Sequence, residues 1–123
     1  MFVLNKMATA MTQLKLESIF GALADPTRRA IVERLLARGE LSVGDIASPF
    51  SISMPAISRH LQVLERAGLV ERRVAAQQRL IRARRDGLDA VASWVTQQRA
   101  HWNAALDRLE ALIAAETPKR RKS

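Results

Sequence analysis

The sequence predicts a mostly helical domain that carries one small β-hairpin. Apolar side chains recur every three or four residues along most of the chain, which is the spacing of amphipathic helices. Ser, Asp, Pro and Gly residues stand where such helices would begin and end. After Gly68 the period changes to that of short strands. With 123 residues, of which 48% are hydrophobic and 26% charged, the chain has the size and composition of one globular domain.

The first two helices are predicted on either side of Asp25. Residues 12–24 have one apolar face, made of Leu16, Ile19, Phe20 and Leu23. Asp25 is a suitable N-cap for the second helix, and Pro26 takes the first helical position, where no backbone N–H is needed. Gly39 ends this helix. Its buried face is expected to consist of Ile31, Val32, Leu35 and Leu36.

A helix-turn-helix is predicted next. Ser42 is expected to cap a short helix, and the segment "SPFSI" then forms a turn. Ser53 caps the following helix, which has Pro55 in its first turn and stops at Gly68. The apolar positions of the short helix are Val43, Ile46 and Ala47, and the buried stripe of the second is Ile57, Leu61 and Leu64. A short helix, a tight turn and a second capped helix are typical of DNA-binding proteins.

The remaining elements predict the winged form of this fold. Two short strands are expected around a turn at residues 75–78, and residues 86–116 form one long amphipathic helix. Its amphipathic part of roughly 28 residues would be about 42 Å long, more than one small domain can cover, so a second copy of the chain is expected to pack against it. The positions of its stripe, at alternating spacings of three and four and apolar except for Gln98, are Leu88, Val91, Val95, Gln98, Trp102, Ala105, Leu109 and Leu112, and Leu106 and Ile113 widen it.

The charge distribution favours a polyanionic partner. The chain carries a formal charge of +8, and residues 53–85 alone contain eight arginines against two glutamates. Four more basic residues lie at positions 119–122, so the rest of the chain is slightly acidic. Confining the excess positive charge to one segment and a tail is typical of nucleic-acid binding. The alternative is a solvated basic face.

The helix at residues 54–67 has the side chains needed to read bases. In a helix-turn-helix the second helix lies in the major groove, with its N-terminal residues nearest the base edges. Arg matches guanine, Gln pairs with adenine, Ser serves either role, and Met and Ala can touch a thymine methyl group. The predicted base-reading residues are Ser53, Met54, Ala56, Ser58, Arg59 and Gln62. For an isolated helix, Arg59 and Gln62 would be interpreted instead as a solvated pair.

The hairpin is predicted to position the protein on the phosphate backbone and in the adjacent minor groove. The candidate residues of this class are His60, Arg73, Gln77, Gln78 and Arg79, with Arg79 the first choice for the minor groove. His60 lies toward the buried edge of its helix, so a packed or capping histidine is an equal alternative. Arginines near the base of the strands have another alternative, ion pairs with Glu65, Glu71 or Asp86.

Four segments together resemble one protein family. "LADPTRRAIVERLL", "LSVGDIA", "SMPAISRHLQVLERAGLV" and the basic hairpin, in this order, resemble the ArsR family of bacterial winged-helix repressors over about residues 14–115. The resemblance implies a homodimer joined by its N- and C-terminal helices and bound to a promoter operator, with an inverted repeat expected from the dimer symmetry. The expected interface residues are Leu16, Ile19, Phe20, Val95, Trp102, Leu106, Leu109 and Ile113.

The metal sites of this family do not carry over to this chain. The chain has no Cys, and Ser42, Val43 and Gly44 stand where thiolate sensors have Cys-Val-Cys. Neither Asp86 nor Asp89 begins the aspartate–histidine pattern of the family's other site. We therefore expect no metal and no cofactor. The Gly usual at the family's wing tip is also replaced, by Ala76.

Other function classes fit less well. An enzyme is not expected, because the chain has two His, no Cys and no Gly-rich phosphate loop. A protein-interaction module would not need the basic segment, and a sequence-indifferent architectural DNA-binding protein remains the alternative. The expected organisation is a flexible segment at 1–11, the domain at 12–115 and a disordered basic tail at 116–123. With no signal peptide or membrane span, the protein is expected in the cytoplasm.

Overall fold

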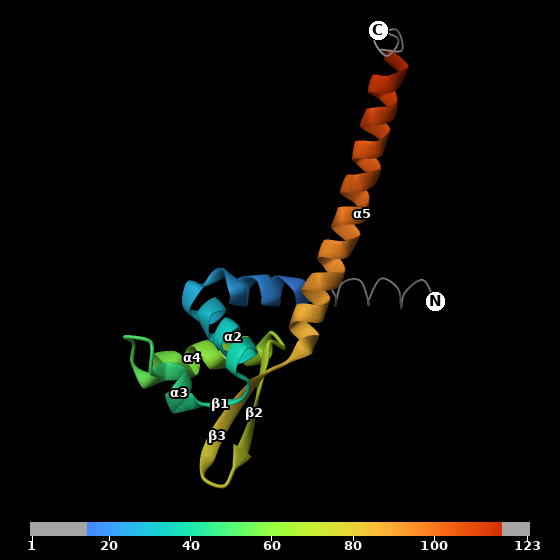
Figure 1. The fold of residues 1–123 in the computed structure, drawn as a ribbon. Helices are drawn as coiled ribbons and strands as arrows, with labels where there is room; N and C mark the ends of the chain where they lie inside the picture. Colours follow the sequence, from blue (N-terminus) through green and yellow to red (C-terminus); the bar gives the residue numbers. More distant parts are fainter. Residues whose placement is uncertain (1–14, 117–123) are drawn as a thin grey trace. The chain divides into compact units, whose positions relative to one another are not determined.

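A computed structural model of the chain describes residues 15–116 (Figure 1). A helix over residues 15–24 is followed by seven further elements. These are α2 (Pro26–Arg38), β1 (Leu41–Ser42), α3 (Val43–Ala47), α4 (Met54–Arg66), β2 (Val70–Ala75), β3 (Gln78–Ala83) and α5 (Arg85–Glu116). The chain divides into one compact unit that ends at Val91 and a second that begins at Ala92. The segment expected at 1–11 and positions 117–123 of the expected tail lie outside the described residues.

The predicted N-caps are confirmed for three helices. The carboxylate of Asp25 accepts a hydrogen bond from the backbone N–H of Arg28 at 3.0 Å. The hydroxyl of Ser42 accepts from the N–H of Asp45 at 3.1 Å, and that of Ser53 from the N–H of Ala56 at 3.3 Å. Each bond satisfies a backbone donor that the first turn of a helix leaves without a partner. The N-terminal boundaries of these three helices are thus set by short polar side chains.

One apolar core lies in the first unit, where helices and strands meet. Its buried members are Ile19, Ala22, Ile31, Val32, Leu35, Ile46, Ile57, Leu61, Leu64, Ala67, Leu69, Val70 and Ile81. The buried stripe predicted for α4 is confirmed in full. Leu36 was expected on the buried face of α2, and this is wrong, because its side chain is 56% exposed. At 100° per residue the stripe of α2 is wide enough for three of the four positions only.

The sheet has three antiparallel strands in the order β1-β3-β2, rather than the two strands expected from the sequence. β1 pairs Leu41 with Ile81 and Ser42 with Leu80, which joins the start of the helix-turn-helix to the hairpin. With two residues, β1 is too short to produce a periodic signal of its own. Ala75 pairs with Gln78, so the hairpin turn consists of Ala76 and Gln77. Ala76 has φ of 55°, which lies in the left-handed region that favours Gly.

The turn after α4 is in close contact with the first turn of α5. Gly68, with φ of 74°, accepts a hydrogen bond from the N–H of Gly87 at 3.0 Å. A Cβ atom on Gly87 would lie 2.8 Å from Leu69 Cδ2, closer than side chains pack. Gly87 is therefore required here for space rather than for backbone freedom.

The second unit contains the remainder of α5, a regular helix to Glu116. The predicted long helix is confirmed, and it begins at Arg85, one residue before the expected start. Its large apolar side chains stay exposed in the single chain. Within residues 15–116, no helix combines the length and hydropathy that a membrane span requires.

Candidate nucleic-acid interface

The two faces of α4 have opposite characters. Ile57, Leu61 and Leu64 are fully buried and hold the helix on the core. Ser58, Arg59 and Gln62 are exposed, as the spacing predicts. No acidic side chain lies on this outer face between residues 53 and 62. The exposed side chains of Ser58, Arg59 and Gln62 can therefore offer hydrogen-bond donors and acceptors to a ligand whose groove admits the helix.

The first turn of α4 adds both polar and apolar groups. The Ser53 hydroxyl accepts a bond as N-cap, which leaves its proton as the group able to reach a partner. Met54 is exposed and Ala56 is half-buried. The six predicted base-reading residues therefore lie on one contiguous stretch of the helix surface or its cap, with Ala56 the least accessible of them.

Arg59 keeps its guanidinium available. Among the described residues it takes part in none of the ion pairs, and it is exposed. A free fork of five N–H donors is the group best suited to two acceptors on a guanine edge.

His60 is held by Arg28, which sequence reasoning did not single out. Arg28 Nη1 lies 3.3 Å from His60 Nδ1, while Arg28 Nε donates to the carbonyl of Ala22 at 2.7 Å and Nη2 to that of Gly21 at 3.2 Å. Because a guanidinium has only donors, Nδ1 of His60 is the acceptor and the ring proton sits on Nε2. The geometry favours the packed-histidine alternative, with Nε2–H as the ring atom left to donate.

The same arginine joins three helices. Its bonds to Gly21 and Ala22 satisfy carbonyls in the last turn of the helix at 15–24, where a positive charge is favourable. The backbone N–H of Arg28 also donates the capping hydrogen bond to the carboxylate of Asp25, and this bond keeps the pKa of Asp25 below its usual value. Arg28 therefore fixes α4 relative to the first two helices.

Most arginines of the hairpin are held in ion pairs within the chain. Arg72 pairs with Glu65 at 3.0 Å, Arg82 pairs with Glu71, and Arg84 pairs with Asp86 at 2.9 Å. These are the three acids named in the ion-pair alternative, which is confirmed. Three of the eight arginines of residues 53–85 are thus compensated by acids of the same chain.

Arg73, predicted as a phosphate contact, is paired with Glu40. Its Nε and Nη2 donate to the two carboxylate oxygens at 2.7 and 2.6 Å. This two-point contact is the geometry in which Arg binds a carboxylate most strongly. It lowers the pKa of Glu40 and raises that of Arg73. Two of the five N–H donors of Arg73 are thus bound to Glu40 and the side chain stays half exposed, so its phosphate contact remains a prediction that would use the other donors.

The tip of the hairpin remains available. Gln77, Gln78 and Arg79 are exposed, and Arg79 lies opposite Val74 in the β2–β3 register. Arg79 takes part in no ion pair among the described residues. The wing thus presents one free cation near its end, out of the four arginines that its two strands contain.

The residues expected at a dimer interface fall into two groups. Ile19 is 1% exposed and belongs to the core of its own unit, so its assignment to the interface is wrong. Leu16 is half-buried and Phe20 exposed on the same helix. In the second unit all the expected positions are exposed in the single chain, namely Val95, Trp102, Leu106, Leu109 and Ile113.

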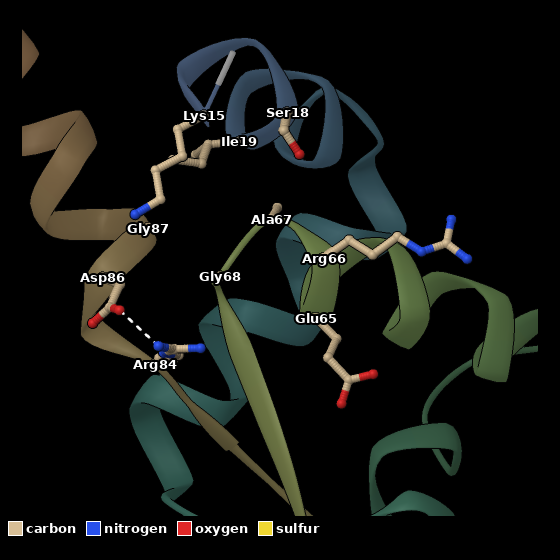
Figure 2. A pocket seen from close by; sticks show the side chains of 10 residues that line it. All are labelled: Lys15, Ser18, Ile19, Glu65, Arg66, Ala67, Gly68, Arg84, Asp86 and Gly87. Atoms are coloured by element: carbon tan, nitrogen blue, oxygen red, sulfur yellow. Dashed lines mark ion pairs between the residues drawn. The ribbon is translucent and has the colours of Figure 1, made fainter. Parts of the chain in front are cut away.

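A small hollow lies where the helix at 15–24, the end of α4 and the start of α5 meet (Figure 2). Its volume is about 160 Å³, below the range of about 300–1,000 Å³ usual for sites of organic ligands. Lys15 and the Arg84–Asp86 ion pair lie around it, so its lining carries both signs of charge. Within residues 15–116, no three His, Cys, Asp or Glu residues come together as a metal site would require.

Comparison with known proteins agrees with this geometry. The model of a helix-turn-helix domain matches residues 23–73, from the end of the first helix into β2. The HTH-type transcriptional regulator Rv2034 of Mycobacterium tuberculosis is 45% identical over 95 residues, which cover 77% of this chain and 85% of that protein. The fold and its exposed helix therefore define a helix-turn-helix transcriptional regulator.

Solved structures name the family. The crystal structure of the ArsR family transcriptional regulator RHA00566 matches with a TM-score of 0.69 and 34% identity, over 74% of this chain and 93% of that one. The homodimeric winged helix-turn-helix domain Mb0332 of Mycobacterium bovis matches with a TM-score of 0.59 and 26% identity, over 81% and 89%. The chain belongs to the ArsR family of winged helix-turn-helix transcriptional regulators.

Proposed function

We propose that this protein is a cytoplasmic homodimeric repressor that binds an inverted-repeat DNA operator at a promoter. It acts by binding DNA and not by catalysis. The observation that carries the proposal is the outer face of α4. That face is polar and has no acid, and within residues 15–116 it takes part in no ion pair, while the apolar stripe on the opposite face is fully buried. The buried face therefore fixes the position of α4, while the polar side chains of its outer face are exposed to a DNA partner.

The roles within the operator follow from which groups are free. Arg59 reads a guanine through its fork, and Gln62 and Ser58 contact neighbouring bases of the same half-site. Arg79 enters the minor groove beside it, and Gln77 and Gln78 contact the backbone. His60, held through Nδ1, donates from Nε2 to a phosphate. Specific recognition thus depends on α4, and the wing positions it.

The apolar stripe of α5 supports the homodimer. At the start of the helix, Leu88 and Val91 pack against the core of their own unit. The same stripe continues through Trp102, Leu109 and Leu112, which are exposed in the single chain. Exposed aromatic and aliphatic side chains in a continuous row are typical of an interface core, and Mb0332, named as homodimeric, has the same fold.

Selection of binding duplexes from a random pool tests this function, with sedimentation measuring the oligomeric state. We expect a dimer and an inverted repeat whose half-site centres lie about 34–36 Å apart, one DNA turn. At fixed salt, the selected duplex should bind at least about a thousandfold more tightly than a scrambled one.

Equal affinity for selected and scrambled duplexes would favour the architectural alternative, to which the basic residues at 119–122 would contribute non-specific affinity. A variant that ends at residue 116 separates the two contributions. Under the repressor proposal it should lose affinity for both duplexes by a similar factor and keep their ratio. Footprinting upstream of the protein's own gene then tests autoregulation.

A further inference from the structure

Two large apolar side chains are left exposed at the turn that leads into α4. Ile52 is 40% exposed and Met54 is 49% exposed. Every other Leu, Ile, Val, Met or Phe between residues 41 and 66 is buried or half-buried. Ile52 and Met54 flank Ser53, the N-cap of α4, and the two exposed side chains are called the apolar patch below.

The position of this patch decides what can cover it. The expected dimer surface is on the helix at 15–24 and on α5, whereas Ile52 and Met54 lie on the helix-turn-helix. The patch lies at the start of the helix that carries Ser58, Arg59 and Gln62, the residues proposed to enter the major groove. It is also at the N-terminal end of α4, the part of a recognition helix closest to the bases. A base edge is therefore the partner that its position fits.

The major groove contains one apolar feature at this depth. Base edges present hydrogen-bond donors and acceptors, except for the methyl group on C5 of thymine. A cytosine methylated at C5 carries the same group at the same position. An exposed Ile beside an exposed Met cannot satisfy a donor or an acceptor, but it can bury a methyl group away from water.

We propose that Ile52 and Met54 read the 5-methyl group of a pyrimidine, so that each operator half-site carries a thymine next to the bases read by Arg59 and Gln62. This inference rests on the proposed function, and it adds Ile52, which sequence reasoning did not assign to the DNA interface. Met54 then acts together with Ile52 as one apolar contact. The same contact would accept 5-methylcytosine, so base methylation at that position would strengthen binding.

Deoxyuridine substitution of the selected operator isolates the methyl group. Uracil keeps the base pairing of thymine and lacks only the methyl, so each thymine in one half-site is replaced in turn and the affinity of the full-length protein is measured. One position should weaken binding about fourfold, the factor that corresponds to ~0.8 kcal/mol for one buried carbon group. At that position, a 5-methylcytosine duplex should bind about fourfold more tightly than an unmethylated cytosine duplex.

Variants assign the effect to the two side chains. On the thymine operator, Ile52→Ala and Met54→Ala should each weaken binding several-fold, and neither should weaken binding further on the uracil operator. Leu36→Ala, another exposed apolar residue but on α2, is the matched control and should bind both operators like the unchanged protein. If Ile52→Ala has a lower melting temperature, Ile52→Thr, which keeps the branched shape, replaces it in the same two binding measurements with the same expected result.

The outcomes separate this inference from the proposed function. If no preferred duplex is selected, the proposed function fails, and the methyl contact with it. If a preferred duplex is found but uracil is tolerated at every position, the methyl contact is overturned while the function stands. Equal losses for the Ile52 and Met54 variants on the thymine and uracil operators would also overturn it, because the side chains would then act on the fold and not on the methyl group.

Discussion

Helix α4 and the β2–β3 hairpin carry their arginines in opposite ways. On α4, Arg59 has no ion-pair partner among the described residues. On the hairpin, Arg72, Arg73 and Arg82 each pair with a glutamate of the same chain. A count of arginines therefore overstates what the wing can offer to phosphates. The difference teaches that the availability of a charge, and not its presence, marks a binding residue.

The largest expected effect distinguishes the two faces of α4. Leu61→Ala removes a fully buried side chain from the core and should lower the free energy of unfolding by about 2–5 kcal/mol. Gln62→Ala, one position further on the exposed face, should change it by less than about 0.5 kcal/mol. Urea denaturation of both variants measures the two values. Similar losses would mean that α4 does not have one buried and one free face.

The next effect concerns binding. Arg59→Ala should weaken operator binding by about 1–3 kcal/mol and relax the preference at one base pair, because a two-point contact to a base is lost. Arg66→Ala, in the last turn of the same helix, is the matched control and should leave that preference intact. Fluorescence anisotropy on duplexes changed one pair at a time gives both numbers. A uniform loss over all sequences would contradict base reading by Arg59.

A smaller effect compares the free and the paired arginines of the wing. Arg79→Ala should reduce the slope of log K against log salt by about 0.9 per protomer, since the minor groove loses one cation that neutralises its flanking phosphates. Arg82→Ala removes a guanidinium that Glu71 already holds, and it should leave the slope nearly unchanged. Titrations at several salt concentrations measure the slopes. If the Arg82 variant shows the larger change, its ion pair must open on DNA.

The smallest effect is the pH dependence of the Glu40–Arg73 pair. Glu40 has a pKa below its usual 4.5 because Arg73 donates two hydrogen bonds to it. A carboxyl group whose folded pKa is lowered stabilises the fold above its unfolded pKa, and this stabilisation is lost as pH falls through the folded value. The unchanged protein should therefore melt at a higher temperature than Glu40→Gln near neutral pH. This difference should be largest there and shrink as the pH falls below 4.5. A difference that stays constant down to the lowest pH would contradict the pairing.

Local features of the fold could be predicted from the sequence, because their signals lie within a few residues. Asp25, Ser42 and Ser53 each bond a backbone N–H three positions ahead, so composition and spacing identify them. The buried stripe of α4 follows from the helical period alone. The exposed face of the same helix follows with it, and so do most of the predicted base-reading residues.

Features that join distant segments could not be predicted in this way. Arg73 and Glu40 are 33 residues apart, and they meet because the two-residue strand β1 pairs with β3. Arg28 and His60 are 32 residues apart. Ile19 shows a different limit, since periodicity identifies an apolar face but not whether the chain's own core or a second copy covers it. For Ile19 its own core does so.

The two-residue turn at Ala76 and Gln77 has a consequence for how the wing can vary. Neighbouring side chains of a strand point to opposite faces, so a slip of β3 by one residue would turn the buried Ile81 to water and its charged neighbour Arg82 inward. The pairing of β3 with β1 on one edge and β2 on the other prevents such a slip. A residue added at the tip would therefore lengthen the turn and leave the strands in register, so the tip can vary in length without disturbing the core.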